Sequence, residues 1–130
     1  MSNIQWMEVL GWGKKHIEDM RFIGNCYVKQ GKYDIAITFF EALCLLSNTT
    51  FDKQTMGALY LQIGKNNEAL TYLDQALKEM PDHLPTQLNR AKALFSLGNK
   101  EEATAQAKPL LKAEDLRIAS QASSLLVAFE

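Results

Sequence analysis

Apolar residues recur at helical spacing along most of the chain, and the same order of positions returns three times. Within residues 17–30 the apolar side chains fall three or four positions apart, which predicts an amphipathic helix. Gly31 follows this helix, and the corresponding glycines, Gly64 and Gly98, stand 33 and then 34 residues further along. A period of this length is typical of stacked helical repeats, in which no single unit buries its apolar face alone.

The pattern divides the 130 residues into five segments of a single domain. Three helical hairpins are expected at residues 17–49, 50–83 and 84–114, with a helix before them in residues 1–16 and a capping helix after them in residues 115–130. In such a stack, function is expected on a groove rather than in a catalytic pocket.

Small residues at Gly24 and Ala36 would let the two helices of the first hairpin approach closely. In the third hairpin Pro109 falls where the returning helix should still run, so a break or kink is expected there. Lys108, immediately before this proline, is expected to leave helical backbone angles.

The two terminal helices have apolar faces of their own. Trp6 and Trp12 allow two interpretations of the N-terminal helix: a cap over the open end of the stack, or a contact in a dimer. The C-terminal helix offers apolar residues to cover the last repeat: Leu116, Ala119, Leu125, Leu126 and Phe129.

The chain contains the spacing Gly24-x-x-Tyr27, followed by Ala36 and Phe40. A second copy follows in Gly57-x-x-Tyr60, Gly64, Ala69 and Pro81. This pattern resembles the tetratricopeptide repeat. The resemblance covers Ile17 to about Asp115. It implies an all-α stack of three helical hairpins in a right-handed superhelix, a scaffold that serves many unrelated binding functions.

A narrower resemblance lies in residues 31–46 and 56–62, which are similar to the junction of the first two repeats in the tetratricopeptide chaperones of bacterial type III secretion. The resemblance implies a cytosolic, non-enzymatic chaperone with a protein or peptide client, a hydrophobic translocator or needle subunit held before export. It also implies a homodimer or a small hetero-complex. The alternatives are a generic scaffold that joins two folded proteins and an assembly subunit of the export apparatus.

In this repeat family the first helix of each hairpin lines the concave surface. The groove residues that follow are Arg21, Asn25, Val28, Lys29, Phe51, Gln54, Ala58, Leu61, Gln62, Leu88, Lys92 and Phe95. Their apolar members could form a trough, and their cations could meet carboxylates or backbone carbonyls of a peptide. Replacing Arg21 with Ala, or Leu61 with Glu, is expected to abolish client binding and leave the fold intact. The alternative for Phe51 and Phe95 is packing against neighbouring repeats or the terminal helix.

A second tetratricopeptide function, binding the acidic tail of heat-shock chaperones, requires basic and amide residues at five fixed groove positions. Arg21 and Asn25 match two of them, whereas Thr55, Pro85 and Asn89 do not. Without the missing cations, two peptide carboxylates would lose charge-assisted hydrogen bonds of about 1.5 to 3 kcal/mol each, so this function is not expected.

Composition argues against several other classes of protein. A net charge of -1 gives no basic footprint for nucleic acid, and no apolar run suggests a signal peptide or membrane insertion. The two cysteines, Cys26 and Cys44, suit reduced core thiols, and the two histidines, His16 and His83, suit solvated or helix-capping side chains. No cofactor, metal or catalytic motif is expected.

Overall fold

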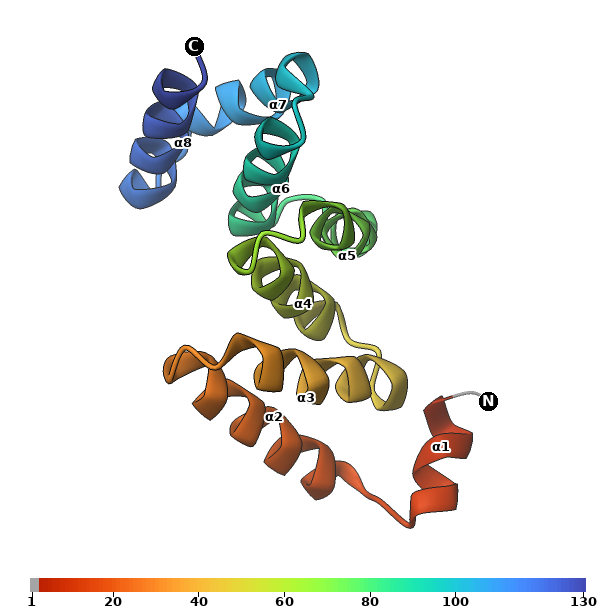
Figure 1. The fold of residues 1–130 in the computed structure, drawn as a ribbon. Helices are drawn as coiled ribbons and strands as arrows, with labels where there is room; N and C mark the ends of the chain where they lie inside the picture. The colour runs from red at the N-terminus through yellow and green to blue at the C-terminus, as the bar shows by residue number, and fades with distance from the viewer. Residues whose placement is uncertain (1–2) are drawn as a thin grey trace.

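The computed structural model describes residues 3–130, and every regular element within them is a helix. Residues 1 and 2 of the expected N-terminal segment lie outside the described residues. In chain order the elements are α1 (Asn3–Leu10), α2 (Lys14–Lys29), α3 (Tyr33–Leu46), α4 (Thr50–Gln62), α5 (Asn66–Glu79), α6 (Leu84–Ser96), α7 (Lys100–Ala107), the 3-10 helix η1 (Lys108–Lys112) and α8 (Leu116–Ala128). Figure 1 shows the hairpins α2/α3, α4/α5 and α6/α7 stacked from one end of the molecule to the other. The expected three hairpins with one extra helix at each end are confirmed.

A left-handed glycine follows the first helix of each hairpin. Gly31, Gly64 and Gly98 have φ angles of 74°, 80° and 85°, a region that side chains other than glycine rarely enter. The amide of each glycine donates to a carbonyl in the last turn of the helix before it, which satisfies an otherwise unpaired group. The repeat period of the sequence is therefore the period of these helix ends.

Close helix packing within the hairpins depends on two other glycines. A Cβ atom at Gly24 would lie 2.9 Å from Cε2 of Phe40, and one at Gly57 would lie 2.5 Å from Cδ2 of Leu73. Phe40 and Leu73 are both fully buried, so they have little room to move. In the first two hairpins the second helix thus packs directly on the glycine of the first helix.

Arg90 joins the second repeat to the third by hydrogen bonds from one guanidinium group. Its Nε donates to Asp74 of α5 at 2.7 Å, Nη1 to Gln106 at 2.8 Å and Nη2 to Glu102 at 2.8 Å, both of α7. Because Arg90 is half-buried and satisfied on three sides, it fixes the position of α6 between its two neighbours.

The break expected at Pro109 is confirmed, but the expectation for Lys108 is wrong. The α-helix ends at Ala107 and continues as η1 through Lys112. Lys108 keeps helical angles, with φ -56° and ψ -46°. Pro109 lies within the first two residues of η1, where no amide hydrogen is needed, so the tighter helix accepts it without an extended residue in front.

The helix α8 covers the last repeat, as expected. Leu125 and Leu126 pack on the third repeat and Phe129 stacks on Phe95, and Ile118 and Ala122 add to this contact. Leu116 is 80% exposed, so its expected covering role is wrong. At the other end α1 packs on α3. Met7 and Trp12 reach the first core, but Phe22 of α2 remains 71% exposed. The helix α1 therefore covers only part of the open end. No helix among residues 3–130 has the length and apolar character needed to cross a bilayer.

Candidate peptide-binding groove

The first helices of the repeats, α2, α4 and α6, carry the expected groove residues, and the structure separates these residues by exposure. Phe51, Lys29 and Gln62 are exposed. Leu88 and Phe95 are buried. The remaining members are half-buried: Arg21, Asn25, Val28, Gln54, Ala58, Leu61 and Lys92. Only part of the expected surface is thus open to a ligand in this structure.

Arg21 is engaged within the protein. Its Nε and Nη2 donate to Oδ1 and Oδ2 of Asp52 at 2.9 and 2.7 Å, and the Asp52 carboxylate is completely buried. Thr49 donates a further hydrogen bond to Asp52 Oδ2 at 2.8 Å. The hydrogen bond to Asp52 raises the pKa of the Arg21 guanidinium. The arginine therefore ties α2 to the start of α4 and neutralises a buried charge, a structural role that the sequence did not reveal.

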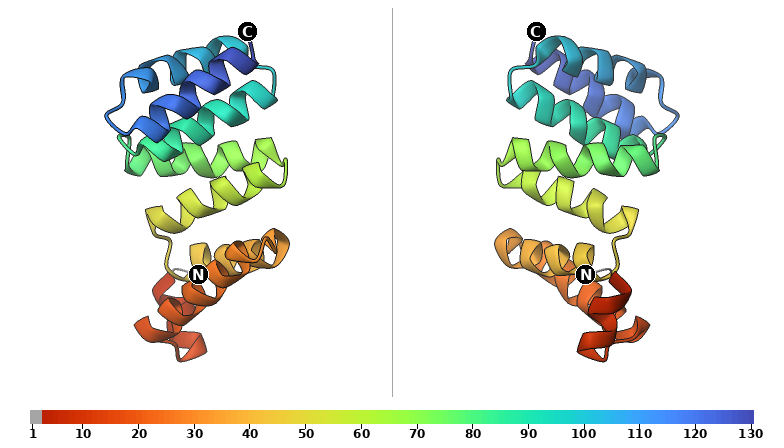
Figure 2. Two further views of the ribbon diagram at one scale, coloured as in Figure 1. Left: turned by 90° about the vertical axis from the view of Figure 1, so that its left-hand side faces the viewer. Right: turned by 90° about the vertical axis from the view of Figure 1, so that its right-hand side faces the viewer.

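Leu88 and Phe95 lie beneath α8. Leu88 clusters with Leu110, Ile118 and Ala122, and the ring of Phe95 stacks on that of Phe129 with centroids 4.7 Å apart. In the left-hand view of Figure 2, α8 crosses the same end of the molecule as α6 and lies nearer the viewer. For Phe95 the structure shows the alternative of packing against the terminal helix.

The open part of the groove centres on α4. Phe51 is 51% exposed and lies in the first turn of α4. Gln54, one turn further on, donates to the sulfur of Met80 at 3.8 Å, and Met80 is itself exposed. An exposed aromatic ring with a flexible thioether nearby suits an apolar side chain of a ligand.

Two cations of the expected groove lack an intramolecular ion pair of the kind that Arg21 forms with Asp52. Neither Lys29 nor Lys92 forms an ion pair within residues 3–130. Lys29 is the last residue of α2, and Lys92 lies in the middle of α6. Each can therefore meet a carboxylate or a carbonyl of a ligand without breaking an existing ion pair.

The groove also has residues that the sequence did not indicate. A hollow of about 240 Å³ lies between α6 and α8, and its lining includes Asn89, Arg117 and Gln121 beside Leu88 and Ile118. Arg117 and Gln121 belong to the terminal helix, which the repeat pattern assigns only a covering role. Recurrence of Ile118, Ala122 and Leu125 at helical spacing was the available signal that α8 lies against α6.

The N-terminal tryptophans take different positions. Trp12 is half-buried, packs against the first core and stacks on His16 with ring centroids 5.6 Å apart. Trp6 is exposed and lines an apolar cleft of about 240 Å³, the N-terminal cleft, together with Trp12, Leu10 and Leu45. Both tryptophans therefore border an apolar surface available for a contact, and Trp12 also packs on the stack.

The histidines and cysteines have local structural explanations. His16 Nδ1 accepts from the amide of Gly13 at 3.1 Å and so caps the start of α2, as expected for a capping side chain. His83 stands at the N-cap of α6, where its Nδ1 lies 2.6 Å from Thr86 Oγ1 and its side chain makes no capping hydrogen bond to the backbone. Cys26 and Cys44 are unbonded and half-buried. Burial raises the pKa of the Cys44 thiol to about 11, which keeps it protonated at neutral pH.

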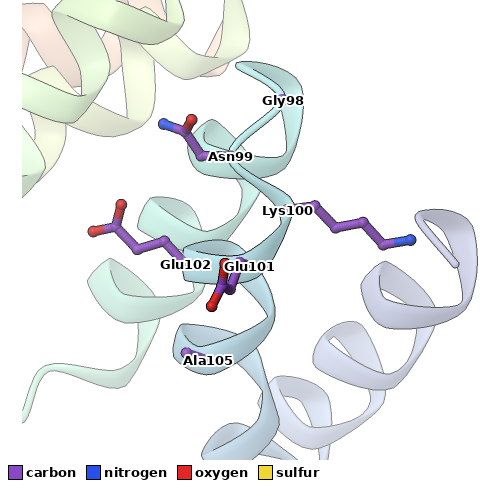
Figure 3. Close-up of a pocket in the computed structure, with 6 residues that line it drawn as sticks. All are labelled: Gly98, Asn99, Lys100, Glu101, Glu102 and Ala105. Carbon is purple, nitrogen blue, oxygen red and sulfur yellow. The ribbon is translucent and has the colours of Figure 1, made fainter.

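A further hollow follows the start of α7 and is lined by residues of that helix and the turn before it (Figure 3). Lys100 extends toward α8, whereas Asn99 and Glu102 extend to the opposite side (Figure 3). Glu102 is bound by Arg90 there. The dipole of α7 favours the negative charges of Glu101 and Glu102 in its first turn, and Glu102 also pairs with Arg90. These interactions explain the two acidic residues without a catalytic pair.

Several solved structures share this fold. PcrH from Pseudomonas aeruginosa matches with a TM-score of 0.76 at 22% identity, over 91% of this chain and 94% of that one. The Yersinia enterocolitica type III secretion chaperone SycD, in complex with a peptide of the translocator YopD, matches with a TM-score of 0.74 at 20% identity, over 91% and 98%. The first repeat domain of RPAP3, bound to an HSP90 peptide, matches with a TM-score of 0.76 at 20% identity, over 89% and 94%. At these identities the similarity shows the fold alone.

Sequence relatives are much longer proteins. The Homo sapiens protein O-mannosyl-transferase TMTC2 is 31% identical over 98 residues, which make up 72% of this chain and 11% of that protein. The chain spans about a tenth of the length of the curated relatives it matches. Two family models described as tetratricopeptide repeat match residues 22–50 and 60–126, the second of which alone covers half of the chain. With the helical hairpins, the left-handed glycines and the repeat period all in agreement, the chain belongs to the tetratricopeptide repeat family.

Proposed function

We propose that the protein is a non-enzymatic chaperone that binds an apolar segment of a protein client in the groove formed by α2, α4 and α6. The observation that carries the proposal is the exposed Phe51 on α4, at a groove position where burial would have been expected of a purely structural residue. Lys29 and Lys92 supply cations that no carboxylate of residues 3–130 engages. An apolar anchor on α4, with unpaired cations further along the groove on α2 and α6, suits a peptide in extended form.

The proposed client is a type III secretion substrate, a translocator or needle subunit, held in the cytoplasm of a bacterium before export. Support comes from the similarity in fold to SycD, which binds a peptide of the translocator YopD. The HSP90-binding fold of RPAP3 is equally similar, but Thr55, Pro85 and Asn89 stand where an acidic tail would need an asparagine and two cations. The residues therefore favour an apolar client over an acidic tail.

A scaffold that joins folded proteins is the second candidate. It is favoured by the higher identity to repeats of long proteins such as TMTC2. The two functions differ in what happens to the partner: a chaperone's client aggregates when it is produced alone, whereas the partners of a scaffold stay soluble and only fail to associate.

Both functions are tested by affinity purification of the tagged protein from its own cell extract. The groove variant is Phe51→Glu, and the matched control is Ile35→Glu, which places the same charge on a side chain that is 43% exposed outside the groove, on α3. We expect one stoichiometric polypeptide to elute with wild type and with the control, to be absent with the groove variant, and to be insoluble when expressed alone. Retention of the partner by Phe51→Glu would contradict a groove-bound client.

A further inference from the structure

A second apolar cleft lies at the C-terminal end of the stack, between α7 and α8. Its volume is about 560 Å³, within the range of ligand sites in proteins. We name it the C-terminal cleft and define it by Lys100 and Thr104 of α7, Lys108 and Leu111 of η1, and Leu126 and Phe129 at the end of α8. None of these residues belongs to the groove of α2, α4 and α6.

The apolar lining of this cleft is not explained by packing within the repeat. Leu111 is 44% exposed, and Phe129 remains 39% exposed although it stacks on Phe95. Most other outward positions of α8 are polar, among them Ser120, Gln121, Ser123 and Ser124, whereas Leu116 and Val127 are apolar and exposed outside the cleft. What distinguishes Leu111 and Phe129 is that they line a shared hollow, which suits an interaction site.

The lining of the cleft also carries two free cations. Lys100 and Lys108 form no ion pair within the part of the chain that the structure describes. Lys100 begins α7, where the helix dipole disfavours a positive charge, and its side chain extends toward α8 (Figure 3). Glu130 also lines the cleft, but no ion pair joins it to either lysine, so both ammonium groups remain open to carboxylates of a ligand. A partner surface complementary to this lining would be apolar and bordered by carboxylates.

We propose that the C-terminal cleft binds an amphipathic helical segment of a partner protein, with apolar side chains on Leu111, Leu126 and Phe129 and two carboxylates on Lys100 and Lys108. The lysines are eight residues apart along a helical path, which is about 12 Å at a rise of 1.5 Å per residue. A helix lying alongside α7 would meet both with acidic residues about seven or eight positions apart and apolar residues between them. This site would act independently of the groove.

The test uses the whole protein and a fluorescein-labelled helical peptide of about 14 residues, with two glutamates about seven positions apart and leucines between them. A second peptide has lysines in place of the two glutamates. Fluorescence anisotropy is measured with wild type and with Lys100→Glu/Lys108→Glu. The matched control is Lys65→Glu/Lys78→Glu, in which two other exposed lysines are reversed. Circular dichroism checks the helical content of each variant.

We expect the acidic peptide to bind wild type, the control and Phe51→Glu alike, and to lose at least about tenfold in affinity with Lys100→Glu/Lys108→Glu. Leu111→Ser should also weaken binding, and the lysine peptide should not bind wild type. Absence of binding to wild type, equal binding of the two peptides, or no effect of charge reversal at Lys100 and Lys108 would overturn the proposal. Loss of binding with Phe51→Glu would assign the peptide to the groove instead.

Discussion

Arg21 and Asp52 form a bidentate ion pair between α2 and α4, with N···O distances of 2.9 and 2.7 Å, and the carboxylate has no contact with solvent. The partners lie 31 residues apart in sequence. This pair changes the expected role of Arg21, because removal of the guanidinium would leave a buried negative charge without a counter-ion.

We therefore predict that Arg21→Ala destabilises the protein by about 3 kcal/mol, the lower end of the range for breaking a buried pair, since Arg21 is partly exposed. The sequence-based expectation that this variant would keep the fold intact is revised accordingly. Urea unfolding followed by circular dichroism measures the effect. Arg117→Ala is the control, because its ion pair with Asp115, at 3.8 Å, is largely exposed and should contribute less than about 1 kcal/mol. Equal stability of the two variants would show that the Arg21 pair is dispensable.

Gly57→Ala should destabilise the second hairpin by about 1 to 3 kcal/mol, because the new Cβ would meet Leu73 at 2.5 Å inside a full core. In the double variant Gly57→Ala/Leu73→Ala the clash is gone. The cost of Gly57→Ala should therefore be smaller in the Leu73→Ala background than in wild type. Thermal or urea unfolding of the four proteins gives the coupling free energy. Additive effects would mean that Leu73 does not limit the approach of α5 to α4.

Acid stability should depend on Glu79. Hydrogen bonds from Lys53 and then from Thr50 lower the pKa of the Glu79 carboxyl below its usual value of 4.5. The folded state therefore favours the carboxylate, so this stabilisation is present above the pKa of the unfolded chain and is lost as pH falls through the lower folded pKa. Urea midpoints measured from about pH 6 to about pH 3 should fall less steeply in Glu79→Gln and in Lys53→Met than in wild type. Parallel curves for wild type and both variants would exclude this coupling.

The N-terminal cleft predicts a contact between two copies of the chain through Trp6. Wild type should show a concentration-dependent dimer in size-exclusion chromatography with light scattering, and Trp6→Glu should be monomeric because a charge would enter an apolar contact. Leu116→Glu at the opposite end of the molecule is the control and should still dimerise. A monomeric wild type at all concentrations would leave α1 with the capping role alone.

The fold was predictable because its determinants are local and periodic. Gly31, Gly64 and Gly98 end helices by their own conformational freedom, and Gly24 and Gly57 permit close approach within a hairpin. These features recur at fixed intervals, so a single sequence reveals them. Even the break at Pro109 follows from the chemistry of one residue.

The candidate site was less predictable because its exposure depends on contacts between distant segments. Position in the repeat placed Leu88 and Phe95 on the groove helix, but α8 returns to cover them. Arg21 is a groove residue by position, and only the fold reveals that Asp52 engages it. Phe51 has no such cover, and its polar neighbours Thr50, Asp52 and Lys53 contrast with the mostly apolar neighbours of Phe95, a local signal of the difference in exposure.

Site-specific photo-cross-linking tests the central claim most directly, because it reports which surface the client contacts in the cell. Benzoylphenylalanine is placed at Phe51 in the groove and, as control, at Ser124 on the exposed surface of α8. We predict that one polypeptide with an apolar segment is cross-linked at position 51 and not at position 124. Adducts confined to position 124, or none at position 51 in a folded protein that co-purifies with a partner, would contradict the account.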